Sequence, residues 1–203
     1  MSFFNLRLAL PRGRVNSTVG ALTFVGHNIM PKLAVVIGLS LMLTSCGLGH
    51  SYTVTTNSMS PTLKVGDTIF ANTIEYKVAP PQRGDIVIVR APDGETESNG
   101  QVQMFPKRVI GVGGDKIQIV ACKVYVNDQV VMENVRGDGG CPPNLLADFG
   151  PVVVPSNEFF LVGDNLPNSR DSRNWKHSTV TKDYIVGKVT TVKDKDTSNI
   201  RSL

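Results

Sequence analysis

The sequence predicts a mainly β fold built from antiparallel sheets, with a membrane-associated segment in front of it. Beyond residue 50, short runs rich in Val, Ile, Thr, Phe and Tyr alternate with Gly, Pro, Asn and Asp, a pattern typical of all-β domains. Asn127 and Asp128 separate two such runs, and both residue types tolerate the positive φ of a two-residue hairpin turn. Residues 33–49, by contrast, form an uncharged apolar run between Lys32 and His50.

The strands are expected where β-branched and aromatic residues cluster between turn-forming residues. In chain order they are Tyr52–Thr56, Thr68–Asn72, Asp85–Ala91, Val102–Val112, Lys116–Ala121, Lys123–Val126, Gln129–Glu133, Val152–Val154, Glu158–Val162 and Ile185–Val192. One helical turn is expected near Thr181–Tyr184, and Gly113-Gly114-Asp115 predicts a tight turn. Ala91–Gly100 and Arg136–Gly150 are polar and rich in Gly and Pro, which predicts surface loops, and Thr197–Leu203 predicts a frayed tail.

A chain of 203 residues that is 41% hydrophobic and 19% charged is long enough for one globular domain with a core. We place this domain at residues 51–193, followed by a tail at residues 194–203. The net charge of +4 comes from four basic residues that precede Lys64, so the remainder carries 17 basic and 17 acidic residues. Because nucleic-acid binding requires a basic face on the folded domain, we expect no nucleic-acid partner.

Residues 1–32 form a basic segment, and the apolar residues 33–49 that follow are at the lower length limit of a membrane-spanning helix. Basic residues upstream of such a segment predict that the N-terminus stays in the cytoplasm. We therefore expect the chain to associate with the bacterial cytoplasmic membrane, with residues 51–203 on its outer, periplasmic side.

Three fates of the apolar segment stay open: a permanent anchor, a cleaved export signal or a lipoprotein signal. Leu43-Thr44-Ser45-Cys46 resembles the lipobox of bacterial lipoproteins, in which the cysteine is acylated, so Cys46 is a candidate for lipidation. The alternative is that Cys46 is a small apolar residue near the end of an anchor helix. A compact lipoprotein signal would start at Met30, and residues 1–29 would then be an over-called start.

Two further cysteines, Cys122 and Cys141, lie in the exported part of the chain. An oxidising compartment favours a disulfide between such a pair, so we expect a bridge that closes the intervening segment. The chain has three histidines and no Cys-x-x-Cys, so this pair does not suggest a metal site.

Ser58 follows the first expected strand, Tyr52–Thr56. Pro61 fixes its own φ and pushes Ser60 toward an extended conformation, so the chain turns here and does not continue as helix. A serine at a strand end can present its hydroxyl and its backbone N–H on the same side, as a nucleophile that contributes to an oxyanion hole requires. Taken alone, Ser-Met-Ser-Pro is equally typical of an ordinary polar turn.

Lys107 has apolar neighbours on both sides in the sequence, and the nearest carboxylate in the chain is Asp115. Burial in apolar surroundings lowers the pKa of a lysine, which lets the neutral amine accept a proton near pH 7. The alternative is a surface lysine whose stem lies along a strand.

Several motifs together resemble the conserved boxes of the type I signal peptidase family, which are S26-type serine peptidases with a Ser/Lys dyad. In chain order the motifs are Ser58-Met59-Ser60-Pro61-Thr62-Leu63-Lys64-Val65-Gly66-Asp67, Arg83-Gly84-Asp85-Ile86-Val87, Lys107-Arg108-Val109-Ile110-Gly111 with Gly114-Asp115, Gly163-Asp164-Asn165 and Ser169-Arg170-Asp171-Ser172-Arg173. The resemblance covers nearly all of residues 51–192 and implies a signal-peptidase-like complex β fold. It extends equally to signal-peptidase-like proteases that mature conjugation proteins or pilins.

By position in these motifs, the resemblance implies that Ser58 is the nucleophile and Lys107 the general base. It also implies that Thr56 assists the backbone N–H of Ser58 in binding the oxyanion. Asp171 and Arg173 fall on a pair of charges that supports the site from outside.

Ser169 falls where the family has a hydroxyl that orients the lysine. The preceding stretch, Asn165-Leu166-Pro167-Asn168, lacks the Arg-Asp that often follows Gly-Asp-Asn in the family, so we expect this loop to turn differently near Ser169. A Ser-His-Asp triad of His177 with Asp171 or Asp183 is the alternative. It is disfavoured because Lys107 already supplies a base.

The resemblance implies a serine endopeptidase that removes N-terminal signal peptides from exported precursors after small residues of the Ala-x-Ala type, with no cofactor and no metal. The strands that end near Ser58 and Lys107 would pair with an extended substrate through backbone hydrogen bonds. The residues expected to contact the substrate are Tyr52, Val54, Thr55, Asn57, Met59, Met104, Phe105 and Pro106.

Two other interpretations compete with this one. A self-cleaving repressor-type Ser/Lys protease has a similar fold, but its DNA-binding N-terminus does not fit the export segment. An envelope lipoprotein would use the same β-domain for binding and not for cleavage.

Overall fold

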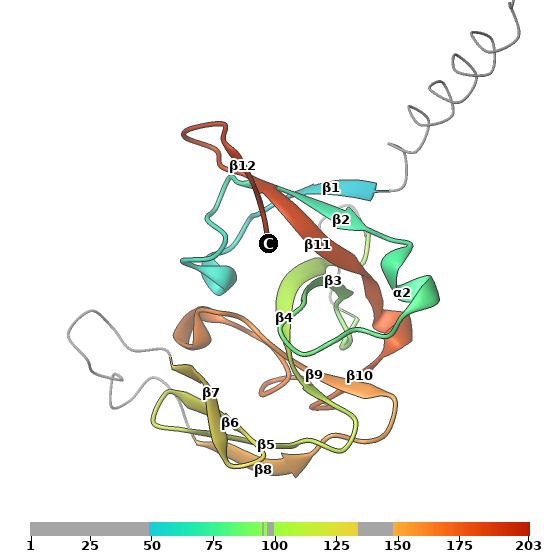
Figure 1. Ribbon diagram of the computed structural model, residues 1–203, viewed down its shortest axis with the longest axis vertical. Helices are drawn as coiled ribbons and strands as arrows, with labels where there is room; N and C mark the ends of the chain where they lie inside the picture. Colours follow the sequence, from blue (N-terminus) through green and yellow to red (C-terminus); the bar gives the residue numbers. More distant parts are fainter. Residues whose placement is uncertain (1–48, 95, 97–99, 134–147) are drawn as a thin grey trace, which may run out of the picture. The chain divides into compact units, whose positions relative to one another are not determined.

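The computed structural model describes residues 49–94, 96, 100–133 and 148–203 (Figure 1). Cys46, Cys141 and the predicted membrane segment apart from Gly49 lie outside these residues. Within the described part of the chain, no helix has the length and apolar character needed to cross a membrane.

The described strands form two antiparallel sheets, as the sequence predicts. The larger sheet has eight strands in the order β1-β2-β11-β3-β4-β9-β10, with β12 paired to β11. Its strands are β1 (Gly49–Thr53), β2 (Thr68–Asn72), β3 (Ile86–Arg90), β4 (Met104–Val112), β9 (Glu158–Val162), β10 (Val180–Thr181), β11 (Ile185–Lys193) and β12 (Ile200–Ser202). The smaller sheet has the order β7-β6-β5-β8 and consists of β5 (Lys116–Val120), β6 (Lys123–Val126), β7 (Gln129–Glu133) and β8 (Phe149–Val153). The short helical turns are η2 (Asn57–Met59), α2 (Glu75–Val78), η3 (Leu166–Asn168) and η4 (Lys182–Tyr184).

The two-residue period of strand β3 divides its side chains between two hydrophobic clusters. Ile86 and Ile88 pack in a cluster with residues of β2 and β11, whereas Val87 and Val89 pack in a second cluster with residues of β4 and β9. Because both faces are covered, the strand is a continuous apolar run and does not alternate with polar residues.

Strand β9 divides its side chains in the same way. Phe159 and Leu161 join the second cluster, and Phe160 and Val162 join a third cluster that covers the smaller sheet. The smaller sheet lies beside β9 at one end of the described fold (Figure 1). Strand β9 therefore packs against both sheets, and the chain leaves it directly into the segment that carries Asp164 and Asp171.

The predicted hairpin turn between β6 and β7 is confirmed. Asn127 and Asp128 have φ values of 52° and 65°, the left-handed conformation that these residue types tolerate. The helical turn expected near Thr181–Tyr184 is also present, as η4.

The structure differs from the predicted elements at both ends of the described domain. Strand β1 begins at Gly49 and ends at Thr53, earlier than predicted, because the chain turns toward Ser58 after Val54. The prediction of a frayed tail is wrong, because Ile200–Ser202 forms β12 and pairs with β11.

The short elements that were not predicted include β10 and α2, neither of which has a distinctive sequence period. Strand β10 has only two residues. Helix α2 begins after Asn72, whose Oδ1 accepts hydrogen bonds from the backbone N–H groups of Ile74 and Glu75.

Cys122 is buried and disulfide-bonded. Its partner lies outside the described residues, so the pairing with Cys141 stays a prediction.

Replacing Phe160 by Ala is expected to lower the free energy of unfolding by about 3–5 kcal/mol, because the ring is fully buried and its loss leaves a cavity. The exposed Val153→Ala variant, from the neighbouring sheet, should change it by less than about 0.5 kcal/mol. Urea unfolding followed by circular dichroism measures both values. Equal losses in the two variants would contradict the assignment of Phe160 to a core shared by the two sheets.

Candidate active site

Ser58 lies in the turn η2, between β1 and β2. Ser60 has the extended backbone that the following proline requires, with φ −65° and ψ 141°. Met59 and Leu63 are completely buried, and the backbone N–H of Leu63 donates to the Met59 carbonyl at 2.9 Å. These two apolar side chains anchor the turn, so the conformation of Ser58 is set by the core beneath it.

Lys107 reaches Ser58 from strand β4. Its Nζ atom lies 3.1 Å from the Ser58 Oγ and 3.2 Å from the carbonyl oxygen of Pro106. Lys107 is 1% exposed and Ser58 is 5% exposed, so water has little access to either group. Two residues that are 49 positions apart in the sequence thus share one buried hydrogen bond.

Burial lowers the pKa of Lys107 to about 8. The carboxylates of Asp171 and Asp164 act in the opposite direction and raise the pKa, while the guanidinium of Arg173 lowers it. At a pKa of about 8, roughly one lysine in ten is neutral at pH 7, which is far more than for a solvent-exposed lysine.

Asp171 and Arg173 form a buried ion pair next to this site. The Nε and Nη2 groups of the Arg173 guanidinium donate to the two oxygens of Asp171, at 2.7 and 2.8 Å. Arg173 also donates to the carbonyl oxygens of Leu166 and Ser169, and Asp171 accepts from the N–H of Gly163 at 3.1 Å. The pair therefore fixes the loop that follows β9, and its opposite charges have opposing effects on the pKa of Lys107.

A second ion pair joins strand β4, which carries Lys107, to the same loop. Arg108, the residue after Lys107, donates to both oxygens of Asp164 at 2.7 and 2.6 Å. Thr62 from the Ser58 turn donates its hydroxyl to the Asp164 carboxylate at 2.5 Å. Arg108 and Asp164 both lie in the quoted motifs, but the motifs alone do not indicate that they pair.

Gly163 permits the end of β9 to approach the Ser58 turn. A Cβ atom at this position would clash with the Ser58 carbonyl oxygen and with the Ser169 Oγ. Asn165, two residues later, also contacts the Ser58 turn. Its backbone N–H donates to the Ser58 carbonyl and its Nδ2 donates to the Asn57 carbonyl, both at 3.0 Å. Only glycine fits at this position, because the backbones are too close for a side chain.

Thr56 lies next to the proposed nucleophile, as the sequence predicts. Its Oγ1 atom is 3.1 Å from the Ser58 Oγ, and either hydroxyl can be the donor. The threonine hydroxyl is therefore within hydrogen-bond distance of the Ser58 hydroxyl.

The hydrogen bond from Ser169 to Lys107 that the resemblance implies is not formed. The Ser169 hydroxyl is buried without a hydrogen-bond partner and lies against Gly163. Ser169 follows the η3 turn, and Arg173 donates to its backbone carbonyl oxygen at 3.1 Å. The altered loop expected from Asn165-Leu166-Pro167-Asn168 is consistent with this arrangement.

A groove of about 380 Å³ lies between β1 and the strand that carries Lys107. Four of the residues expected to contact substrate line it: Tyr52, Thr55, Met104 and Pro106. Asn57 is exposed, and Phe105 is half-buried with its ring centre 5.4 Å from the Lys107 Nζ.

Val54 and Met59 do not line the groove, contrary to expectation. Both belong to the first hydrophobic cluster, with exposed fractions of 2% and 0%. The turn that brings Ser58 to Lys107 points these side chains into the core, so they cannot contact a bound peptide in this conformation.

His177 is not part of the Ser58 site. It lines a different and larger hollow of about 520 Å³, together with Lys176 and Tyr184, and that hollow contains neither Ser58 nor Lys107. In the part of the chain that the structure describes, no group of His, Cys, Asp and Glu side chains is placed to hold a metal ion.

A sequence profile described as "Signal peptidase, peptidase S26" matches residues 27–193, which include all of these side chains. The chain belongs to the signal peptidase family, peptidase S26. It is 33% identical over 156 residues to signal peptidase I of Leptolyngbya laminosa, covering 75% of this chain and 73% of that protein. It is 36% identical over 161 residues to signal peptidase I T of Bacillus subtilis, covering 77% of this chain and 79% of that protein. A crystal structure of a signal peptidase I from Enterococcus faecalis is 27% identical and covers 54% of this chain and 97% of that one, with a TM-score of 0.41.

The side chain of Lys107 is expected to titrate with a midpoint of about pH 8, because burial disfavours its charged form. The measurement is the pH dependence of the ¹³Cε resonance of Lys107 in protein labelled with ¹³C-lysine. The resonance is assigned by its absence from the Lys107→Ala variant. A midpoint of about 10.4, the value of a solvated lysine, would contradict the buried environment.

Proposed function

We propose that this signal peptidase family member cleaves peptide bonds with Ser58 as nucleophile and Lys107 as general base, and removes N-terminal signal peptides from exported precursors. The observation that carries the proposal is the buried hydrogen bond of 3.1 Å between Lys107 Nζ and Ser58 Oγ. A serine needs a nearby base, and a lysine is a base only when it has lost its proton. The lowered pKa of Lys107 supports this assignment.

The neutral Lys107 amine takes the Ser58 proton while Ser58 attacks the scissile carbonyl carbon. The negative charge that develops on the carbonyl oxygen is stabilised by the backbone N–H of Ser58 and by the hydroxyl of Thr56. Lys107, now an ammonium, gives its proton to the leaving amine, and the mature protein departs. Lys107 then activates a water that hydrolyses the ester on Ser58, which regenerates both groups.

The pair of Asp171 and Arg173 keeps the environment of Lys107 close to neutral. An unpaired Asp171 would favour the ammonium and remove the base, and an unpaired Arg173 would repel the ammonium that forms during the reaction. The two charges are joined at 2.7 Å and have opposing effects on the pKa of Lys107, on which burial is the largest influence.

The groove lined by Thr55 and Pro106, which precede Thr56 and Lys107 in the chain, suits an extended peptide. Strands β1 and β4 border it, and peptides commonly bind such strands through backbone hydrogen bonds. Tyr52, Thr55, Met104 and Pro106 would contact alternate side chains of the substrate. We assign to this groove the preference for small residues of the Ala-x-Ala type.

We also propose that residues 51–203 act on the outer side of the bacterial cytoplasmic membrane, held there by the segment at residues 33–49. Attachment to the membrane confines enzyme and membrane-held precursor to one surface, which raises their effective concentration. A disulfide-bonded Cys122 is consistent with an oxidising compartment.

Both Ser58→Ala and Lys107→Ala are expected to reduce cleavage of a precursor peptide with an Ala-x-Ala site by at least about a thousandfold. The reason is that the nucleophile and the base act together, so that removing either one disables the pair. Cleavage is measured by mass spectrometry of the products. Ser60→Ala, in the same turn, and Lys116→Ala, a partly exposed lysine of β5, are the matched controls and should keep full activity. Normal processing by either dyad variant would refute the assignment.

If the apolar segment is a lipoprotein signal, cells that express the chain should incorporate labelled palmitate into it, and Cys46→Ser should abolish the label. The reason is that acylation requires the thiol of that cysteine. If the wild-type chain takes up no label, the lipoprotein signal is refuted and an anchor or a cleaved signal remains.

A further inference from the structure

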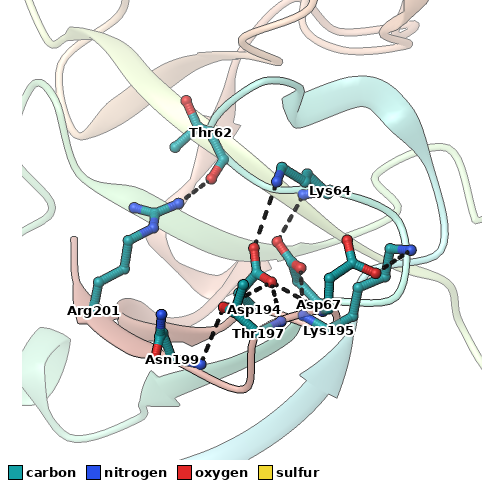
Figure 2. Close-up of polar contacts among 9 residues, drawn as sticks. Thr62, Lys64, Asp67, Asp194, Lys195, Thr197, Asn199 and Arg201 are labelled. Carbon is teal, nitrogen blue, oxygen red and sulfur yellow. Dashed lines mark hydrogen bonds and ion pairs between the residues drawn. The ribbon is translucent and has the colours of Figure 1, made fainter.

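The segment that follows β11 lies against the turn that carries Ser58. Residues 194–203 are outside the part of the chain that matches the signal peptidase family, which ends at residue 193. Figure 2 shows Asp194, Lys195 and Arg201 of this segment next to Thr62, Lys64 and Asp67. We call residues 194–202 the return segment.

Asp194 gives the return segment a defined shape. Its side-chain carboxylate accepts hydrogen bonds from the backbone N–H groups of Asp196 and Thr197, both at 2.9 Å, and its own N–H donates to the Asn199 carbonyl. The chain reverses through this turn and returns as β12, paired with β11. The position of Arg201 is therefore set by a hydrogen-bonded turn and a strand.

Asp67 joins the return segment to one end of the Ser58 turn. It is 2% exposed, and its carboxylate accepts from the Lys64 N–H at 2.8 Å and from the Lys195 N–H at 3.1 Å. Gly66 lies directly under the Lys195 side chain, where an added Cβ would be 2.6 Å from a side-chain carbon. These contacts fix where the turn ends and β2 begins.

Of these contacts of the return segment, the one made by Arg201 involves the residue nearest to Ser58 in the sequence. Its guanidinium donates to the backbone carbonyl of Thr62, four positions after the serine. The hydroxyl of Thr62 donates to Asp164, and Asp164 is bound by Arg108 next to Lys107. Thr62 is thus held on its carbonyl side by the return segment and on its hydroxyl side by the ion pair beside the base.

We propose that Arg201 is a positioning residue for the reaction: it holds Thr62 so that Ser58 stays at hydrogen-bond distance from Lys107. The proposal rests on the Ser58/Lys107 dyad described above. Arg201 is exposed, and exposed contacts of this kind add little to the stability of the fold. The geometry of a reacting pair is far more sensitive, because a displacement of about 1 Å can lower a rate by about a hundredfold.

The test compares Arg201→Ala, Arg201→Lys and Ile200→Ala in steady-state cleavage of a precursor peptide. Ile200 precedes Arg201 on β12 and is 65% exposed, so its replacement changes the same strand without removing the contact. We expect Arg201→Ala to lower kcat about tenfold and to change KM by less than about twofold, since the substrate groove is untouched. Arg201→Lys should restore most of kcat because an ammonium can also donate to the Thr62 carbonyl. Ile200→Ala should behave as wild type.

Thermal unfolding of the same variants separates positioning from stability. The midpoint of Arg201→Ala should change by less than about 2 °C. Wild-type kcat in Arg201→Ala would overturn the proposal. A large fall in midpoint together with kcat, or a rise in KM at unchanged kcat, would also overturn it. Ser58→Ala in the same assay tests the dyad separately: if that variant is active, the proposed function fails, and if it is inactive while Arg201→Ala is fully active, only the role of Arg201 fails.

Discussion

The burial of the Lys107 amine is the constraint on which the rest of the site depends. Removing an ammonium from water is costly, so the buried group shifts toward its neutral form. This shift makes the amine useful as a base, but it holds only while water stays out and the nearby charges balance. Lys107 is 1% exposed, and the two ionic groups with the largest electrostatic effect on its pKa, Asp171 and Arg173, are joined to each other.

The fold meets this constraint with elements that already serve the core. Strand β4, which carries Lys107, lies between β3 and β9. Apolar side chains of these neighbouring strands pack on both faces of the sheet. The loop after β9 then passes so close to the Ser58 turn that only a glycine fits at position 163. The ion pairs Arg108–Asp164 and Arg173–Asp171 stabilise this loop, and burial is the largest influence on the Lys107 amine. The same contacts that exclude water also set the distance between Ser58 and Lys107.

The sequence predicted the antiparallel strands well, because the Val- and Ile-rich runs and the Asn127-Asp128 turn reflect local preferences of the backbone. It also indicated Ser58, Lys107 and the charged pair as one site, since their motifs resemble a single family. It was less reliable for the neighbours of these residues. Val54 and Met59 were expected in the groove and lie in the core, and the Ser169 hydroxyl was expected to contact Lys107 but has no hydrogen-bond partner. A motif fixes residue identity, but the direction of a side chain depends on how the loop turns.

The sequence by itself determined the class of fold and a chain neutral beyond its basic N-terminus, because residue types and local order are enough for these. It indicated the candidate nucleophile and base only through the resemblance of several motifs to one family. Only the tertiary structure decided that Lys107 is buried, that Arg108 pairs with Asp164, and that residues 194–202 return as strand β12, paired with β11, and contact the turn that carries Ser58. Each of these depends on contacts between residues that are far apart in the chain. Such contacts arise from packing, which local sequence preferences do not encode.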